Sequence, residues 1–404
     1  MSSYSIDLQC PQCGAPVVLD ETERIVACEY CRVRHIIISG KHQTYCIPPR
    51  QETSPDALLY IPYWRFKGMS FALQDAQVRH RLMDSSAQAV EHAGIPFSLG
   101  LRSQTQHLQQ VTSASPGRFL IPALSGKVLL ERMIEHGLGF GAEGHSTLQL
   151  QAHVGEVVSL IYSPVLVGSQ TLTDGITGRS YSRQALSLAQ EPVSPEPPAS
   201  MSFLPVLCPH CGWDLAGETK SLCLRCTNCC SLWIGYKGRL IEIPFQFYGS
   251  SLHEESYLPF WQFKASAPDQ SGNTSLPILQ PFSDEGSDQA FMVPAFKIHP
   301  GLFLRLSRQM TPGSASGLNP DKFPRAAYYP ATLPFRESFQ FLPILLSRMV
   351  RNTQQLAEDL SQATLKPRQV KLVFVPFHSR GSDLVQPEKN IGLHKNALSI
   401  GRLF

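Results

Sequence analysis

The chain has 404 residues, of which 43% are hydrophobic and only 17% are charged, and its formal net charge is +3. This length predicts two or three domains of ~150 residues with substantial hydrophobic cores, and the composition excludes disorder over most of the chain. The near-neutral charge contains no long block of one sign, so it gives little support to a dedicated nucleic-acid or membrane-surface binder.

The sequence contains neither a recognisable membrane span nor an export signal. No stretch approaches the ~18 consecutive apolar residues that cross a bilayer, and the first nine residues are polar. We therefore expect a cytoplasmic protein. Eight of the eleven cysteines fall in C-x-x-C pairs, which in a reducing compartment more often hold a metal than form disulfides.

A cysteine quartet lies in the first predicted module, residues 1–45. Cys10-Pro-Gln-Cys13-Gly is followed after fourteen residues by Cys28-Glu-Tyr-Cys31. Each C-x-x-C pair can form a tight turn that directs two thiolates at one point. The segments on either side of residues 20–23 predict a hairpin between the two pairs, and a further strand is expected over 33–39.

An aromatic strand characterises the next predicted module, a β-rich α+β unit over residues 46–188. The sequence YIPYWRFK at residues 60–67 alternates well enough for a strand. Leu59, Ile61, Tyr63 and Arg65 are expected on one face, and Tyr60, Trp64 and Phe66 on the other.

Residues 189–202 are rich in proline and are predicted to be a linker. Prolines exclude a helix interior or a central strand, so this stretch is expected to run extended.

A second quartet follows, in a module predicted over residues 203–245. Cys208-Pro-His-Cys211-Gly precedes Cys226-Thr-Asn-Cys229 with the same fourteen-residue gap as in the first quartet. Cys223 also forms a C-x-x-C pair with Cys226, but only Cys226 with Cys229 reproduces the first spacing. The three remaining cysteines are expected to be ordinary buried or half-exposed thiols, namely Cys46, Cys223 and Cys230.

The quartets belong to a longer internal similarity. The sequence IPYWRFK at 61–67 matches LPFWQFK at 258–264 with nearly the same offset as the quartets. A third block pairs 119–124 with 291–296, and a fourth pairs 160–165 with 372–377. We therefore predict two copies of one unit, with a second β-rich α+β unit over residues 246–404.

Helices are predicted at three places. Segments 127–136 and 302–310 follow the two members of the third block, and Leu345, Met349, Leu356 and Leu360 recur at helical spacing within 344–360. The predicted fold class is α+β with β predominating. Each copy is expected to contain a ribbon followed by a mainly antiparallel sheet with one or two helices.

The two quartets resemble the zinc-ribbon, or rubredoxin-like, family, whose pattern C-P-x-C-G, hairpin, C-x-x-C matches all eight cysteines. The resemblance covers about 30 residues in each half and implies a tandem zinc-ribbon protein of a bacterial type. Arg32 and Cys230 stand where the second pair of the family usually carries glycine, so a different second turn is possible.

A shell of four cysteines has no open coordination position for water or substrate, so the sites are predicted to be structural. We expect two Zn²⁺ ions per chain, although iron in the same shell, in a redox protein, is an alternative. The predicted metal ligands are Cys10, Cys13, Cys28 and Cys31 in the first site and Cys208, Cys211, Cys226 and Cys229 in the second.

Two interpretations are open for the aromatic strands. Trp64 and Trp261 either anchor the core of each β-rich unit or contribute to a groove that holds a peptide or a base between an aromatic face and a cation. The candidate groove residues are Tyr63, Trp64, Lys67, Phe260, Trp261 and Lys264.

The sequence shows no phosphate-binding loop, nucleophile elbow or metalloprotease motif. Histidine and glutamate residues are adjacent at 253–255 and at 135–136, but these candidate acid–base groups are expected to be exposed to solvent. We therefore predict a non-catalytic interaction or scaffold protein that binds a protein partner within a larger assembly. The alternative is a nucleic-acid-associated factor of transcription or replication, by analogy with other zinc ribbons. Each Zn²⁺ with four thiolates carries about −2, so the loaded protein is near −1, which disfavours that alternative.

Overall fold

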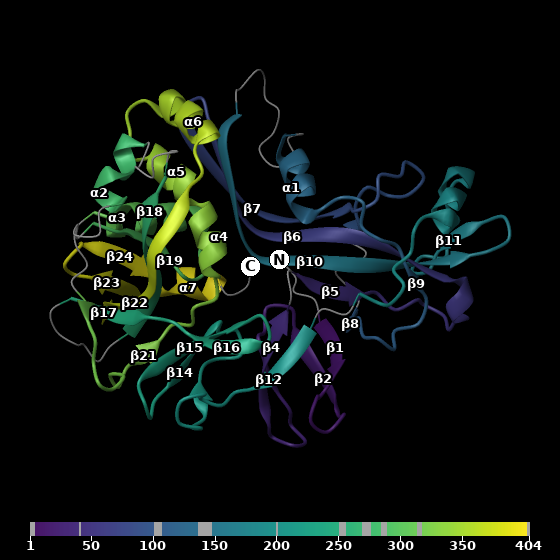
Figure 1. The fold of residues 1–404 in the computed structure, drawn as a ribbon, viewed down its shortest axis with the longest axis horizontal. Coiled ribbons are helices and arrows are strands. Elements are labelled where there is room, and N and C mark those ends of the chain that lie inside the picture. The colour runs from purple at the N-terminus through teal and green to yellow at the C-terminus, as the bar shows by residue number, and fades with distance from the viewer. Residues whose placement is uncertain are drawn as a thin grey trace. The chain divides into compact units, whose positions relative to one another are not determined.

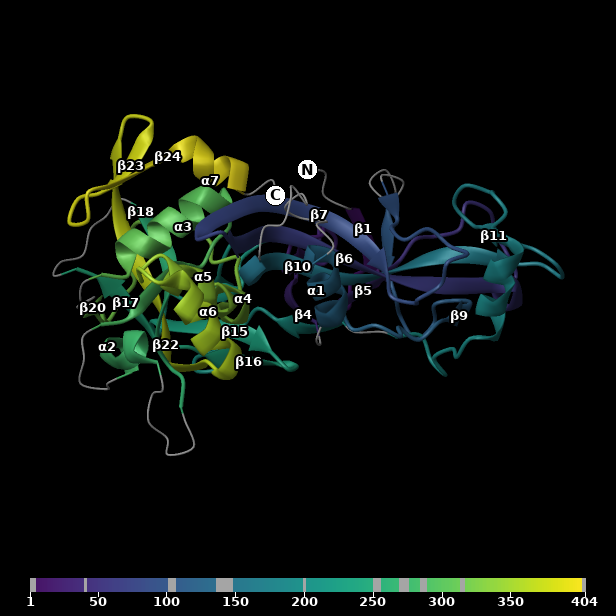
Figure 2. The same ribbon diagram turned by 90° about the horizontal axis from the view of Figure 1, so that it is seen from above.

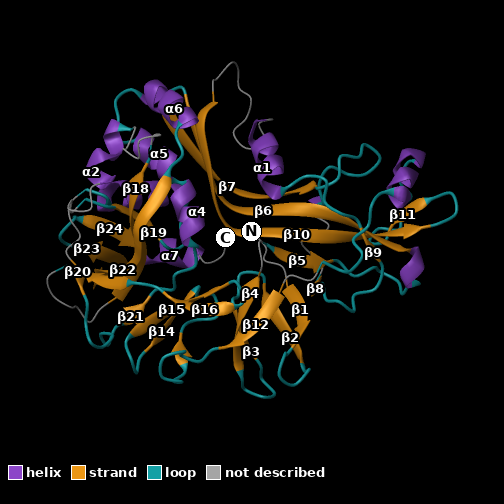
Figure 3. Cartoon of the chain, in the orientation of Figure 1, coloured by secondary structure: helices purple, strands orange, loops and turns teal. Residues whose placement is uncertain are grey.

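The structure is a computed structural model that describes residues 5–39, 42–100, 107–135, 148–198, 201–249, 256–268, 276–283, 289–312 and 317–401. The fold is β-rich α+β, as predicted, and Figure 3 shows most of the helices in the C-terminal half of the chain. None of the helices in these ranges has the length and apolar composition needed to cross a membrane.

The chain forms two compact units, each built from several stretches of sequence. Unit 1 comprises Met1–Lys67, Met83–Leu138 and Val157–Pro205, and unit 2 comprises Gly68–Leu82, Gly139–Glu156 and Val206–Phe404. Two excursions from the first half of the sequence therefore belong to unit 2. The sequence predicted modules that follow one another along the chain, so it did not predict that these two segments belong to unit 2.

Unit 1 consists mainly of strands (Figure 1). Its elements, three of which continue into unit 2, are β1 (Ser5–Gln9), β2 (Pro16–Asp20), β3 (Ile25–Ala27), β4 (Arg34–Ser39), β5 (Gln43–Cys46), η1 (Pro55–Ala57), β6 (Leu58–Gln74), β7 (Gln77–Gln88), β8 (Leu108–Gln110), β9 (Arg118–Phe119), α1 (Gly126–Glu135), β10 (Leu148–Val167), β11 (Leu172–Asp174), η3 (Arg183–Gln190) and β12 (Met201–Pro205). The larger sheet has the order β2-β1-β8-β5-β10-β6-β7, and the smaller sheet has the order β12-β4-β3.

Unit 2 combines a small sheet, a larger sheet and six α-helices among its described residues, more than the one or two helices expected. Its further elements are β13 (Leu215–Ala216), β14 (Cys223–Cys226), β15 (Ser231–Tyr236), β16 (Arg239–Glu242), β17 (Phe245–Tyr248), β18 (Ser256–Ser266), η4 (Pro277–Leu279), α2 (Gln280–Ser283), β19 (Phe291–Pro294), α3 (Pro300–Met310), β20 (Gly317–Leu318), β21 (Ala327–Tyr328), α4 (Phe335–Gln340), α5 (Leu342–Ser347), α6 (Thr353–Gln362), β22 (Lys366–Arg380), β23 (Asp383–Gln386), β24 (Ile391–His394) and α7 (Lys395–Gly401). The sheets have the orders β13-β14-β15-β16 and β19-β18-β22-β17-β20, and Figure 2 shows α7 following the β23–β24 hairpin.

The strands of the first ribbon lie where the sequence predicts them, but their pairing differs. Strand β2 pairs antiparallel with β1, and β3 pairs antiparallel with β4, so the predicted hairpin between β2 and β3 is wrong. The turn between these strands carries a buried glutamate, Glu21. A charged side chain that is buried in this turn needs partners outside the ribbon, and these partners are described below.

The aromatic strand of unit 1 has the two faces that the sequence predicts. Leu59, Ile61 and Tyr63 belong to one buried cluster of unit 1. Trp64 and Phe66 belong to another. Because successive side chains of a strand point to opposite faces, this strand serves both cores.

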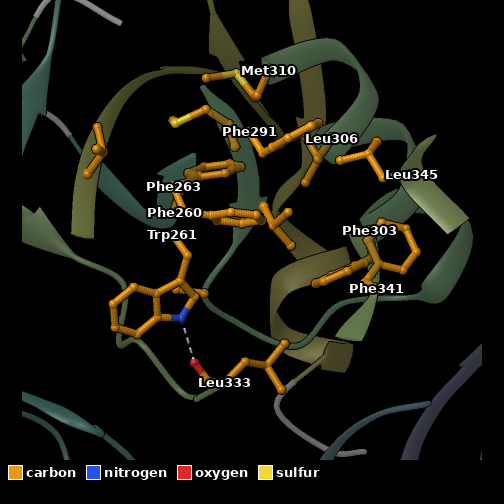
Figure 4. Close-up of a cluster of buried hydrophobic side chains, with 14 of the residues drawn as sticks. Phe260, Trp261, Phe263, Phe291, Phe303, Leu306, Met310, Leu333, Phe341 and Leu345 are labelled. Atoms are coloured by element: carbon orange, nitrogen blue, oxygen red, sulfur yellow. Dashed lines mark hydrogen bonds between the residues drawn. The ribbon is translucent and has the colours of Figure 1, made fainter. Parts of the chain in front are cut away.

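The corresponding strand of unit 2 is equally buried. Trp261 on β18 is 2% exposed, and its indole nitrogen donates a hydrogen bond to the carbonyl of Leu333 at 2.8 Å (Figure 4). Phe263 and Phe291 lie in the same cluster, which forms the core of unit 2.

Four contacts around the tryptophan strand recur in the two units, three between backbone atoms and one from the indole nitrogen. Ala89 N donates to Pro62 O at 2.9 Å, as Ala295 N does to Pro259 O at 3.0 Å. Parallel pairing joins β9 to β6 and, in the same way, β21 to β18. The tryptophan of each strand donates to a leucine carbonyl at 2.8 Å. Finally, β5 pairs parallel with β10 in unit 1, and β17 pairs parallel with β22 in unit 2.

These contacts correct the third block of the predicted similarity. Strand β19 runs antiparallel to β18, whereas β9 runs parallel to β6. Segments 119–124 and 291–296 therefore occupy different places, and the counterpart of 119–124 is 328–333. Short proline-containing sequences look alike, but the hydrogen-bonding partner of each strand decides its equivalence.

The helices that follow these segments were predicted with mixed success. The predictions at 127–136 and 302–310 correspond to α1 and α3, although His136 lies outside the described residues. The prediction of one helix over 344–360 is wrong, because α5 ends at Ser347 and α6 begins at Thr353. Asn352 starts the second helix by accepting a hydrogen bond from Gln355 N at 3.1 Å, which is typical of a cap residue.

The proline-rich stretch at 189–202 is held against unit 1. Ile121 N donates to Pro192 O at 3.1 Å, and Ser194 N donates to Phe119 O at 2.7 Å. Strand β12 then pairs with β4 of the first ribbon. Residues 189–190 belong to η3 and not to an extended linker, and backbone hydrogen bonds hold the described residues that follow them against unit 1.

Candidate metal centres

The four cysteines of the first quartet converge on one point of unit 1. Cys10 and Cys13 lie in the turn between β1 and β2, and Cys28 and Cys31 lie in the turn between β3 and β4. The sulfur atoms of Cys10 and Cys31 are 3.7 Å apart, and those of Cys13 and Cys28 are 3.6 Å apart. The two turns therefore bring together residues that are distant in sequence.

The second quartet forms the same arrangement within unit 2. The sulfur atoms of Cys208 and Cys229 are 3.6 Å apart, and those of Cys211 and Cys226 are 3.5 Å apart. In each quartet all four sulfur atoms lie within 4.8 Å of one another. The second group contains Cys226 and Cys229 and not Cys223, in line with the spacing of the first quartet.

The size of both quartets fits a tetrahedral metal ion. A zinc–sulfur bond of ~2.3 Å places the sulfur atoms of a regular tetrahedron ~3.8 Å apart. The sulfur–sulfur distances given above are close to that value, and no disulfide joins the cysteines. Both quartets can therefore hold a metal ion in a closed shell of four thiolates.

Positive φ angles build the turns that carry the ligands. Gly14 and Gly212 have φ of 74° and 71°, and a Cβ atom at either position would meet nothing within 4 Å. Arg32 and Cys230, which replace the glycine expected after the second pair, have φ of 59° and 52°. The second turns thus keep the left-handed conformation at a conformational cost of about 1 kcal/mol per residue.

Backbone hydrogen bonds reinforce the first turn of each quartet. Gly14 N donates to Cys10 O at 2.9 Å, and Gly212 N donates to Cys208 O at 2.8 Å. In the second quartet, Ser231 Oγ also lies 3.1 Å from Cys229 Sγ and accepts a hydrogen bond from Trp233 Nε1 at 2.8 Å. Such outer partners orient the ligands of a metal site.

The thiols of the two quartets differ in their pKa values. Burial raises the pKa of Cys208, but hydrogen bonds from the N–H groups of Cys211 and His210 lower it by more, so the pKa falls to about 6. Burial raises the pKa of Cys226 to about 12. The pKa of Cys28 is lowered to about 7, chiefly by the N–H group of Cys31. Four adjacent thiols do not ionise together unless a cation compensates their charge, which a divalent metal would do.

The three remaining cysteines are ordinary thiols, as expected. Cys46 and Cys223 are buried, and burial raises their pKa values to about 11 and about 12. Cys230 is half-buried and its thiol contacts Pro320 O at 3.2 Å.

The predicted groove around the two tryptophans does not exist. Every candidate groove residue is buried, with exposed fractions of 7% or less for Tyr63, Trp64, Lys67, Phe260, Trp261 and Lys264. Trp64 donates to Leu124 O at 2.8 Å, in the same manner as Trp261 to Leu333 O. The alternative interpretation, that these tryptophans anchor the cores, is correct, because side chains this deeply buried offer no surface to a ligand.

A buried ionic network explains the lysine of the first aromatic strand. Lys67 Nζ lies 2.8 Å from Glu21 Oε1, and Arg65 also forms an ion pair with Glu21. Arg65 Nε in turn lies 3.0 Å from Asp84 Oδ1. Glu21 therefore attaches the turn of the first ribbon to β6, a role that local sequence patterns do not indicate.

The candidate acid–base groups at 253–255 and at His136 lie outside the described residues, as does His145. Among the described histidines, His107 is exposed and lies 3.2 Å from Asp7, whereas His153 is buried.

No protein-family model, no curated protein and no solved structure matches the chain.

Proposed function

We propose that the protein is a non-catalytic scaffold or adaptor whose two zinc ribbons, of the rubredoxin-like kind, act as structural centres for two duplicated units. The observation that carries this proposal is the pair of closed cysteine quartets. In each, four thiols already occupy the positions of a tetrahedral shell, so a bound Zn²⁺ has no free position for water or substrate. The metal would supply stability to modules that are too small to form large cores.

The recurring contacts around the tryptophan strands support the idea of duplication. The same tryptophan-to-leucine hydrogen bond occurs in both units. A short strand pairs parallel with the tryptophan strand in each unit, β9 with β6 in unit 1 and β21 with β18 in unit 2. Because these contacts join residues far apart in sequence, their recurrence is better explained by two copies of one ancestral unit than by chance. We assign the copies to residues 1–188 and 203–404, with ribbons at 1–45 and 203–245.

The role in an assembly is inferred from the exposed apolar side chains of the ribbons. Trp213 lies between the two cysteine pairs of the second quartet and is 57% exposed, and Tyr30 lies within the second pair of the first quartet and is 72% exposed. Aromatic side chains at the surface are enriched where proteins bind one another. We infer a protein partner within a larger cytoplasmic assembly.

Affinity purification of the full-length protein from its native cells tests this proposal. The bait is compared with a Trp213→Ser/Tyr30→Ser variant that retains both quartets. Proteins enriched by the wild type and lost with the variant support the adaptor role. Equal recovery with both baits, or nucleic acid that co-purifies at low salt and is released at high salt, contradicts it.

A further inference from the structure

A cavity of about 150 Å³ lies between the ribbon and the larger sheet of unit 2. Arg225 and Cys223 contribute to it from β14, Tyr328 from β21, and Leu372 and Phe374 from β22. Leu222 N donates to Ala331 O at 2.8 Å and so holds the ribbon against this wall. We call this space the Arg225 cavity.

The cationic group of the cavity is Arg225. Its guanidinium carbon lies 3.8 Å from the centre of the Tyr328 ring and 5.5 Å from that of Phe323. Among the described residues, no carboxylate forms an ion pair with Arg225. A half-buried guanidinium that rests on aromatic rings is desolvated on one side, so an anion on its open edge would be favourable.

The backbone of Arg225 is held by its neighbour Cys226 in the quartet and by the strand pairing of β14 with β15. The neighbouring residue Cys226 is a predicted metal ligand, and Arg225 pairs with Leu232 across the β14–β15 ladder. At the turn of the cavity wall, Ser221 Oγ accepts a hydrogen bond from Glu218 N at 2.9 Å. A Cβ atom on Gly217 would approach Leu224 within 2.5 Å, so the backbone packs closely there. The charged group is therefore presented by a rigid frame.

Charge and shape restrict what the cavity can accept. Glu218 is exposed and also lines the cavity, so it would repel a multiply charged anion such as a phosphate ester more strongly than an anion with a single charge. Leu232, Phe374 and Ala331 provide apolar walls. A cavity of ~150 Å³ has room for a benzene-sized molecule. A ligand with a single negative charge and a flat apolar body therefore suits the charge, the apolar walls and the volume of the cavity.

We propose that the Arg225 cavity binds a small monocarboxylate with a flat apolar body. The planar guanidinium matches a carboxylate with two parallel hydrogen bonds. The apolar body of the ligand would lie against Leu232 and Phe374. At the offset that relates the two quartets, the first ribbon has Ala27 in place of Arg225. The equivalent position of the first ribbon therefore lacks the cation of this site, and ligand binding by the second ribbon goes beyond the structural role proposed for the ribbons.

Fluorine NMR of 4-fluorobenzoate with the full-length, metal-loaded protein tests the proposal. We expect one saturable site per chain, and we expect Arg225→Met to weaken binding at least about tenfold, the loss typical of a charge-assisted hydrogen bond. Ala331→Leu, which fills the cavity and keeps the arginine, is expected to abolish binding. The matched control is Arg239→Met, because Arg239 is an exposed arginine of the same ribbon.

Several outcomes would overturn the proposal. Absence of saturable binding to the wild type is one, and unchanged binding to the Ala331→Leu variant, which would place the probe elsewhere, is another. Equal affinity for the neutral 4-fluorobenzyl alcohol would show that the charge is irrelevant. Displacement of the probe by inorganic phosphate at the same concentration would identify a general anion site instead of a carboxylate site. If the arginine variant does not fold, the cavity-filling variant still decides the question.

Discussion

In unit 1 the turn of the ribbon inserts Glu21 among the cations of β6, and Lys67 and Glu21 are each about 1% exposed. At the equivalent offset, the second ribbon carries Thr219, which is exposed, and contacts its sheet through Arg225 and the aromatic ring of Tyr328. Two ribbons with the same ligand spacing are therefore attached to their sheets by different chemistry. The cysteine-bearing turns are alike in the two ribbons, whereas the contact surface next to them differs.

Removal of the metal ligands is expected to have the largest effect and to separate the two units. Structural zinc in small ribbons contributes about 10–16 kcal/mol of binding free energy. Replacement of Cys10 and Cys13 by serine should unfold the first ribbon and leave the second folded. Hydrogen exchange measures this directly, as loss of protection over β1 to β4 with protection retained over β14 and β15. Cys230→Ser, which alters a cysteine outside the quartets, is the control, and collapse of both ribbons in the first variant would contradict their independence.

The charged attachment of the first ribbon is expected to have the next largest effect. Glu21→Gln leaves Lys67 buried without its carboxylate partner, and loss of one member of a buried ion pair typically costs about 3–5 kcal/mol. Urea denaturation of unit 1 measures the change. Thr219→Val at the equivalent position of the second ribbon should change stability by less than ~0.5 kcal/mol, as is usual for exposed sites. Equal effects at the two positions would mean that the ribbons are attached alike.

A buried carboxyl group of unit 2, Glu337, makes the stability of that unit depend on pH near neutrality. Burial raises the pKa of Glu337 to about 7, although Gly155 N donates to its carboxylate at 3.5 Å and Arg336 lies nearby. The folded state binds this proton more tightly than the unfolded state, so the stability gained at low pH is lost as pH rises through about 7. Between pH 5.5 and pH 8 the loss should be about 2 kcal/mol.

Denaturation of the wild type and of Glu337→Gln at both pH values isolates this effect. The variant should remove the difference without changing the response of the quartets to pH. At the equivalent offset in α1, unit 1 has Val128, which is 38% exposed, so Val128→Thr is a control expected to leave the pH profile unchanged. An identical pH dependence in the wild type and in Glu337→Gln would refute the assignment.

The smallest effect tests what the two units share. Trp64→Phe and Trp261→Phe each remove an indole donor and leave a buried leucine carbonyl without its partner, at a cost of about 1–2 kcal/mol. Because the same hydrogen bond occurs in both units, similar losses in chemical denaturation are expected. A loss in only one unit would indicate that the tryptophans do not play equivalent roles.

The two cysteine quartets could be predicted from the sequence because C-x-x-C spacing is local and repeats at a constant interval. The strands of the ribbon could be located in the same way, but their partners could not, since pairing depends on contacts between distant segments. Arg32 and Cys230 illustrate a further limit. Their sequence suggested a different turn, whereas both residues adopt the left-handed conformation that the family assigns to glycine.

The features that distinguish the two units were not predictable. Glu21 belongs to the turn expected at residues 20–23, and only the fold shows that it lies buried beside Lys67. Arg225 belongs to no motif found in the sequence, and only the fold shows that it lies over the ring of Tyr328. The tryptophan motif was recognised, but exposure cannot be derived from alternation alone, so the groove interpretation failed where the core interpretation succeeded. Burial is a property of the assembled unit, not of the strand.

Metal analysis of the purified protein tests the central claim most directly. Inductively coupled plasma mass spectrometry should find two zinc atoms per chain in a colourless preparation, and one zinc atom per chain in either the Cys10→Ser/Cys13→Ser or the Cys208→Ser/Cys211→Ser variant. A preparation without bound metal, a red preparation that contains iron, or loss of both zinc atoms in either variant would contradict two independent structural zinc centres.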